Sequence, residues 1–161
     1  MQVGLDGPTV WVRVQGRGTF QNSTGLKEFA QGMTERGHRE FIVDLKDCEL
    51  MDSTFMGTLA GVAIRLGPEG KLRVVRANER CRKVMKNLGL DRVVAVEEEP
   101  TGNEPPPPLR DAEGNPPREA RRETIIEAHR NLVAADPANE VRFKDVIEFL
   151  QHKEPPDEPR S

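Results

Sequence analysis

The sequence predicts an α/β protein: a mixed, largely parallel sheet with helices, followed by a C-terminal pair of helices. Short apolar runs typical of strands alternate with amphipathic segments of about ten to fifteen residues, which is the pattern of parallel strands with helical connections. A proline-rich stretch then ends this alternation. Two segments with the apolar spacing of helices follow it.

The composition is that of a globular protein with one main core. The chain has 161 residues, of which 35% are hydrophobic and 32% are charged. Its longest apolar stretch is shorter than the ~20 residues needed to cross a bilayer, and we read no signal sequence, so we expect a cytoplasmic protein without a membrane partner. The formal net charge of −3 argues against nucleic acid as a direct partner.

Two strands are expected at the N-terminus, over residues 3–5 and 9–15. In the second, alternate valines form an apolar face, and Trp11 lies on the opposite face. The stretch Gly16–Phe20 lacks the lysine and the spacing of a phosphate-binding loop, so we interpret it as a turn.

An amphipathic helix is expected next. It would begin at Ser23 or Thr24 and end near Gly37, because small polar residues favour helix starts and glycine favours helix ends. Its apolar residues recur at helical spacing: Leu26, Phe29, Ala30 and Met33.

The central unit has a serine at the junction between a strand and a helix. Phe41–Leu45 is an almost continuous apolar run typical of a buried strand, and a polar corner over residues 46–49 follows it. Either Asp52 or Ser53 can cap the helix that comes next, because short polar side chains accept hydrogen bonds from the unpaired amides of a helix start. The apolar residues of this helix are three and four positions apart: Phe55, Leu59, Val62, Ala63 and Leu66.

One further strand, helix and strand complete the predicted sheet. Gly67–Gly70 ends the central helix, and residues 72–75 are expected to form a strand. Asn78 caps the following helix, which leads to Gly89. Residues 93–96 supply the last short strand.

The C-terminal part differs in kind from the rest of the chain. Residues 97–118 are rich in glutamate and proline, with almost nothing apolar to bury, and are interpreted as a linker. Residues 119–151 are expected to form two helices joined by a turn at Asp136-Pro137, and residues 152–161 a disordered tail.

Two such helices cannot close a core by themselves, so we expect them to dock on the sheet, on a second copy in a homodimer, or on a partner. On the sheet, Trp11 is the receptor that we expect. The stripe expected to be buried consists of Ile125, Leu132, Phe143, Ile147 and Leu150.

Ser53 is the candidate functional residue. A phosphoserine carries about −1.5 to −2 charges at pH 7, and free amides at a helix start can bind its oxygens. Position alone favours a simple helix cap, and Thr54 is the nearest competitor as a phosphoacceptor.

A resemblance changes that balance. Val43-Asp44-Leu45, then Met51-Asp52-Ser53-Thr54, then Gly57 resembles the phosphorylation segment of STAS-domain proteins, specifically the bacterial anti-sigma-factor antagonists. The resemblance extends over about the first 96 residues, because Gly16–Phe20 with its helix, Gly70–Val75 and Val84–Leu90 also follow the order and spacing of that family.

The resemblance implies a STAS fold and partner switching without enzymatic activity. Its implied partners are a serine-kinase anti-sigma factor, which binds the unphosphorylated protein, and a metal-dependent serine phosphatase. Ser53 would be the phosphoacceptor, with Asp44 and Asp52 as acidic residues beside it and Phe20, Thr54, Phe55 and Met56 as further partner contacts.

A second hypothesis is a non-phosphorylated STAS scaffold or interaction module that acts through its helical extension, with Ser53 only as a cap. It is favoured by Phe55, because the family usually has glycine two residues after the phosphoacceptor, where the backbone can approach closely.

The remaining reactive side chains indicate no further site. Cys48 and Cys81 are too few for a disulfide framework and are expected to be free thiols, Cys48 as a small buried residue. His38, His129 and His152 are scattered, and we expect His129 on the polar side of its helix. We see no paired carboxylates, no cysteine–histidine arrangement and no nucleotide loop, so we expect neither an enzyme nor a bound metal or cofactor.

Overall fold

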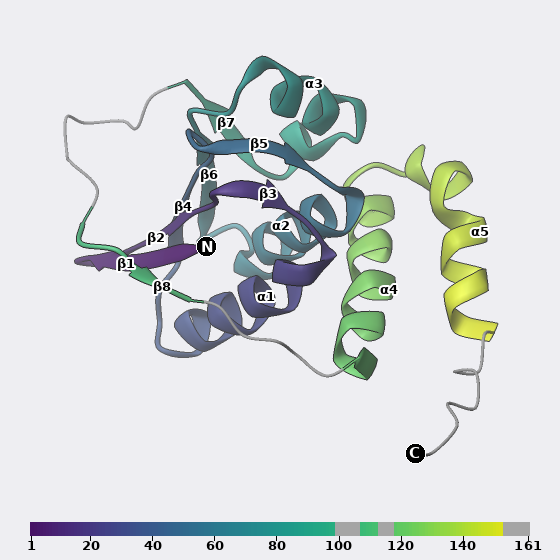
Figure 1. Ribbon diagram of the computed structural model, residues 1–161, viewed down its shortest axis with the longest axis horizontal. Helices are drawn as coiled ribbons and strands as arrows, with labels where there is room; N and C mark the ends of the chain where they lie inside the picture. The colour runs from purple at the N-terminus through teal and green to yellow at the C-terminus, as the bar shows by residue number, and fades with distance from the viewer. Residues whose placement is uncertain (99–106, 113–117, 153–161) are drawn as a thin grey trace.

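The structure is a computed structural model that describes residues 1–98, 107–112 and 118–152. The helices in this part of the chain are α1 (Phe20–Glu35), α2 (Ser53–Leu66), α3 (Glu79–Asn87), the 3-10 helix η1 (Leu90–Arg92), α4 (Arg118–Ala135) and α5 (Asn139–His152) (Figure 1). The strands are β1 (Gln2–Asp6), β2 (Thr9–Arg13), β3 (Gly16–Gly18), β4 (Glu40–Asp44), β5 (Cys48–Met51), β6 (Lys71–Val75), β7 (Ala95–Glu97) and β8 (Arg110–Asp111).

The main sheet has the strand order β7-β6-β4-β2-β1-β8. The pairs β2–β4, β4–β6 and β6–β7 are parallel, whereas β1 is antiparallel to both β2 and β8. The predicted fold class, a mixed and largely parallel sheet with helices and a C-terminal helical pair, is therefore confirmed.

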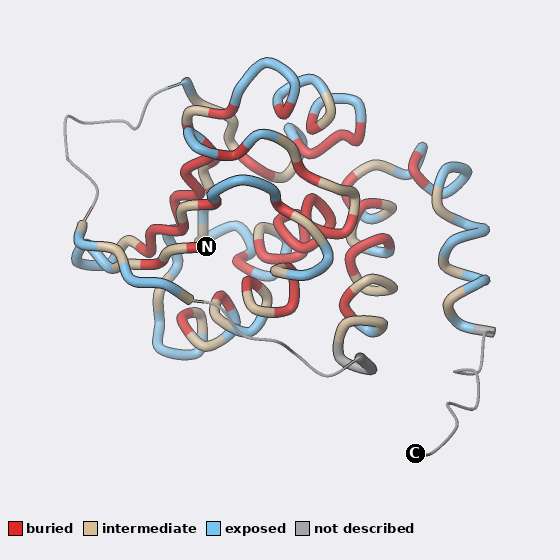
Figure 2. Tube along the Cα trace, in the orientation of Figure 1, coloured by how far each residue is buried: buried red, intermediate tan, exposed pale blue. Residues whose placement is uncertain are grey.

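The main core lies between this sheet and helices α1 and α2 (Figure 2). The alternating valines of β2 and the apolar run of β4 point into it, as their sequence pattern predicts. Helix α2 differs from an ordinary surface helix because most of its residues are buried. A helix that is apolar on all sides must be covered on both sides, and Figure 1 shows α2 between the sheet and α4.

Two segments predicted as a turn and a polar corner contain strands instead. Strands β3 and β5 pair in parallel as a separate two-stranded sheet. At the end of β3, Gly18 gives room to the ring of Phe55, since a Cβ on Gly18 would lie 2.6 Å from the Cδ1 atom of Phe55. The prediction missed these strands because they are too short for an alternation to be recognised.

Helix α1 begins earlier than predicted. Its N-cap is Thr19, whose side chain accepts from the Gln21 amide, while the Thr19 amide donates to the Asn22 side chain at 2.8 Å. Ser23 and Thr24 were expected at the helix start but are buried inside it. The caps of the other predicted helices agree better, and Asn78 accepts from the Cys81 amide at 2.7 Å.

The part of the outer sheet face around Trp11 is covered by residues 107–109 and not by the C-terminal helices. Trp11 is buried there in a small cluster with Ile42 and Val75, against which Leu109 packs. Gly4 permits this cover, because a Cβ on Gly4 would lie 2.7 Å from the carbonyl oxygen of Pro108. Trp11 as the receptor for the C-terminal helices was therefore wrong, and part of the expected linker is a sheet strand, β8.

The C-terminal helices dock on the same chain, on the side of α1 and α2 away from the sheet (Figure 1). Within the expected apolar stripe, Leu132 is fully buried, and Phe143 packs against the main core. Ile125, Ile147 and Leu150 are only partly buried. The expected tail from residue 153 and the linker segments 99–106 and 113–117 lie outside the described residues.

Cys48 and Cys81 are both buried free thiols in the main core, as expected. Burial raises the pKa of both, that of Cys81 to about 11, with the neighbouring Cys48 as a further cause. A buried thiol without a cationic neighbour strong enough to offset its desolvation stays protonated and unreactive.

We predict that replacing Leu109 with alanine shifts the fluorescence emission of Trp11 toward that of an exposed indole, because Leu109 covers it. The loss of this partly buried contact should lower the free energy of unfolding by on the order of 1 kcal/mol. The matched control is Leu132→Ala on α4, which should cost about 2–5 kcal/mol but leave the emission of the folded protein unchanged. The opposite pattern would mean that the C-terminal helices cover Trp11.

We also predict that both thiols react with iodoacetamide at pH 8 roughly a hundred-fold or more slowly in the folded protein than in urea, measured by mass spectrometry.

The folded pKa of Cys81 is raised above the unfolded value of about 8.5, so its contribution to stability is complete below that value. This contribution should be lost as the pH rises from about 8.5 through 11, and Cys81→Ala should weaken that loss.

Candidate functional site

The candidate site lies where β5 ends and α2 begins. Asp52, in an extended conformation, is the N-cap of α2 and accepts from the Phe55 amide at 2.8 Å. Its second carboxylate oxygen accepts from the Phe20 amide, also at 2.8 Å, so one side chain holds the starts of α1 and α2 together. Of the two caps that the sequence left open, Asp52 is the cap, and Ser53 is the first helical residue.

The Ser53 hydroxyl contacts a histidine from the C-terminal extension. The Oγ atom of Ser53 lies 3.0 Å from Nε2 of His129, and Nδ1 of His129 lies 2.7 Å from the carbonyl oxygen of Ile125. A carbonyl oxygen only accepts, so Nδ1 carries a hydrogen; in the neutral ring, Nε2 then accepts the hydrogen bond from Ser53. His129 is 4% exposed and packs in a T-shaped arrangement with the Phe143 ring, so its expected position on the polar side of its helix was wrong.

The expected partner contacts around Ser53 differ in exposure. Phe20 is 41% exposed and stands at the surface beside the Asp52 cap. Thr54, Phe55 and Met56 are buried, and Phe55 and Met56 belong to the main core. Phe55 and Met56 were expected as apolar contacts in the surface around Ser53, whereas the first turn of α2 directs both side chains into the core.

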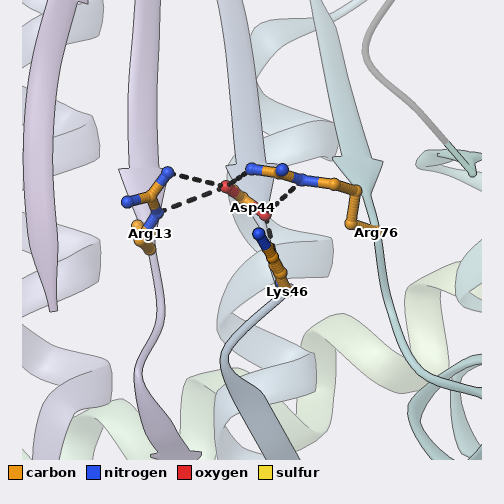
Figure 3. Close-up of polar contacts among 4 residues, drawn as sticks. All are labelled: Arg13, Asp44, Lys46 and Arg76. Carbon is orange, nitrogen blue, oxygen red and sulfur yellow. Dashed lines mark hydrogen bonds and ion pairs between the residues drawn. The ribbon is translucent and has the colours of Figure 1, made fainter. Parts of the chain in front are cut away.

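Asp44 is a buried carboxylate at the end of β4, held between two arginines on the neighbouring strands or just beyond them (Figure 3). Arg13 approaches it to 3.3 Å, and the Arg76 guanidinium pairs with both of its oxygens. The Lys46 amide donates to it at 3.0 Å. Asp44 is 0% exposed, so it supports the C-terminal ends of the central strands from inside and is not a surface residue next to Ser53.

Arg76 adopts a positive φ of 56°, the only such non-glycine residue in the part of the chain that the structure describes. A left-handed backbone is unfavourable for a residue with a Cβ. The Arg76 side chain pairs with the buried Asp44, and this contact holds the chain where it leaves β6.

Helix α4 packs very closely on the side of α2 that faces away from the sheet. A Cβ on Gly57 would lie 2.1 Å from the carbonyl oxygen of Ala128, and a Cβ on Gly61 would lie 2.2 Å from the Nδ2 atom of Asn131. The two glycines are four residues apart and therefore lie on one helix face. Such small residues allow two helix backbones to approach closely, and here they form the seat of α4.

Polar contacts at the rim also hold α4 in place. Glu127 pairs with Lys27 of α1 and, at 2.9 Å, with Arg65 of α2. Burial acts to raise the pKa of Glu127, but the two cations outweigh it and lower this pKa below its usual value. In the interior of the interface, the hydroxyls of Thr24 and Thr124 are 2.9 Å apart.

The sequence contained one signal for this arrangement that the prediction did not use. The central helix has Gly57, Ala60, Gly61 and Ala63 among its apolar residues and no polar face before Arg65. A helix without a polar face requires a cover on each side. His129 could have been found as a site residue only after that cover was assigned to α4.

Among the described residues, no group of three or more histidine, cysteine, aspartate or glutamate side chains could hold a metal ion. The described helices include none that is both long and apolar enough to cross a membrane.

We predict that Asp44→Ala lowers the free energy of unfolding by about 3 kcal/mol in urea titrations, because it leaves Arg13 and Arg76 without their shared counter-charge. Glu40→Ala on the same strand is the matched control. Glu40 is exposed and should cost less than about 0.5 kcal/mol. Equal costs for the two variants would contradict a structural role for the buried carboxylate.

Comparison with known proteins extends this description. The family model described as "Mlab, STAS domain" matches residues 1–96. No curated protein matches the chain. Helices α4 and α5 follow the matched region, so the cover over Ser53 is outside the family's common domain.

The fold is similar to solved structures of low sequence identity. A crystal structure of a candidate anti-sigma factor antagonist from Thermotoga maritima has a TM-score of 0.55 and 19% identity, over 60% of this chain and 84% of that chain. The anti-sigma factor antagonist SpoIIAA in its unphosphorylated form has a TM-score of 0.52 and 16% identity, over 63% of this chain and 88% of that chain. Together with the family match over residues 1–96, these similarities confirm the resemblance: the chain belongs to the STAS domain family.

Proposed function

We propose that this chain is an anti-sigma-factor antagonist that works by partner switching and not by catalysis. In the cytoplasm, it would bind a serine-kinase anti-sigma factor, be phosphorylated by that kinase on Ser53, and be restored by a metal-dependent serine phosphatase. The observation that carries the proposal is Ser53 itself: a partly buried hydroxyl at the first position of α2, directly after the Asp52 cap, in a STAS domain.

The local electrostatics support a switch at this position. Adding about −2 charges to Ser53 would set a phosphate beside the Asp52 carboxylate, which already accepts the Phe55 and Phe20 amides. Like charges at such short range disfavour any interface that desolvates them. The exposed ring of Phe20 next to this cap is the apolar contact that such an interface would use first.

The other expected site residues would stabilise the site from the protein interior. Phe55 and Met56 would fix the first turn of α2 in the core, and Asp44 would fix the end of β4, which precedes β5 and α2 in the chain. Thr54 is buried, and the hydroxyl of Ser53 is therefore the better phosphoacceptor of the two.

A second candidate is a STAS interaction module that acts through its C-terminal extension. Helix α5 favours it, because Val141 and Phe149 are 88% and 59% exposed on this helix. In that case, Ser53 would remain a structural residue under α4, and the extension would carry the contact with another protein or with a second copy.

We predict that phosphopeptide mapping of the protein purified from its native host finds phosphate on Ser53, with an intact-mass increase that phosphatase removes. The proteins that co-purify with the Ser53→Ala variant should include a kinase. The Ser53→Asp variant should capture about ten-fold less of this kinase or even less, because charge at this position disfavours the interface. Thr54→Val is the control and should change neither result.

Phosphate on Thr54, or none while a bound kinase is active, would exclude Ser53 as the acceptor. Equal capture of the kinase by Ser53→Ala and Ser53→Asp would be compatible with phosphorylation of Ser53 but would rule out switching by charge.

A further inference from the structure

The position of His129 over Ser53 has a consequence for any modification of that hydroxyl. The two side chains come from α2 and α4, belong to residues 76 positions apart in sequence, and meet at 3.0 Å, with His129 buried. His129 in turn is held by the Ile125 carbonyl and by the ring of Phe143, so swinging it away from Ser53 would break both of these contacts. A group added to the Ser53 oxygen along this direction would meet the imidazole ring.

The close packing of α4 on Gly57 and Gly61 leaves no space for such a group. At Gly57, one turn after Ser53, there is no room even for a methyl group, because the backbone of Ala128 occupies the space where it would lie. The contact is between backbones, so a side-chain rotation cannot relieve it. Helix α4 therefore stays at this distance or leaves the face as a unit.

Further contacts couple α4 to α5 and to the domain beneath. Asn139, at the start of α5, donates to the carbonyl oxygens of Leu88 and Leu132, at 2.8 Å each. Arg142 of α5 donates to the Asn87 carbonyl at 3.0 Å. The two helices thus dock together, so displacing α4 from α2 would also weaken the contacts of α5.

We propose that α4 is an intramolecular lock on Ser53: docked α4 blocks the addition of a phosphoryl group to Ser53, and a phosphate on Ser53 displaces α4 and α5. In the transfer, the Ser53 oxygen forms a bond to the γ-phosphorus of ATP, the bond to ADP breaks, and the hydroxyl proton, now shared with His129, is released. This lock is a regulation of the site in the proposed function and rests on it.

Thermodynamic linkage makes the lock reciprocal. If phosphate weakens the docking of α4 by some factor, an undocked α4 favours the phosphorylated form by the same factor. The new charge would stand next to Asp52, so repulsion and steric exclusion act in the same direction.

The first test uses full-length protein with phosphoserine incorporated at position 53 during translation, which needs no cellular kinase. Hydrogen exchange followed by mass spectrometry should show that amides of α4 and α5 exchange on the order of ten-fold faster or more than in the unmodified protein, while β4 stays protected. Unchanged or slower exchange in α4 would overturn the lock.

The second test opens the lock without phosphate. Gly57→Ala adds a methyl group whose three nearest heavy atoms all belong to Ala128 of α4, and Gly32→Ala on α1 is the matched control, because a Cβ there meets nothing within 4 Å. In a Ser53→Cys background, N-ethylmaleimide should label Cys at position 53 at least about ten-fold faster with Gly57→Ala and at an unchanged rate with Gly32→Ala. Equal labelling rates in both variants would contradict the lock.

A milder variant keeps the test informative if Gly57→Ala does not fold. Gly61→Ala adds a methyl group that meets the ends of the Asn131 and Arg65 side chains, and it should speed labelling by a smaller factor.

The experiment with incorporated phosphoserine also separates the two proposals. A host protein without phosphate on Ser53 while a bound kinase is active would refute the proposed function and leave the exchange result standing, whereas unchanged exchange would refute only the lock.

Discussion

Backbone contact between α2 and α4 is the constraint on which the functional part of this molecule depends. The contact exists because Gly57 and Gly61 carry no Cβ on the side where Ala128 and Asn131 approach. It lets α2 be apolar on both sides, one toward the sheet and one toward α4. It also fixes the distance at which His129 stands over Ser53, so the same two glycines determine stability and access to the hydroxyl.

The N-cap of α2 adds a second level of organisation. Asp52 accepts from amides of two helices, which makes the start of α2 dependent on the start of α1. Charge added at Ser53 would therefore act on a carboxylate that is already fully engaged. Asp44 performs a comparable task at the C-terminal end of β4, where its burial between Arg13 and Arg76 joins β4 to β2 and to the end of β6.

The parts of the fold with strong periodicity could be predicted from the sequence, and those that depend on long-range pairing could not. The strands containing Val10 and Phe41 and the helix that starts at Ser53 have clear apolar patterns and a cap, so local chemistry alone predicts them. The short strands β3, β5 and β8 are defined by their partners more than by their own residues. Leu109 covers Trp11 for the same reason: a proline-rich segment that buries one leucine has no pattern that predicts where it lies.

Covalent attachment gives α4 an advantage over any free protein that competes for its seat. A tethered segment behaves as a ligand at an effective concentration on the order of millimolar. A competitor present at micromolar concentration must therefore bind the face formed by Gly57 and Gly61 roughly a thousand-fold more tightly than α4 does. Cutting the chain between β8 and α4 would remove this advantage while leaving every contact of the seat intact.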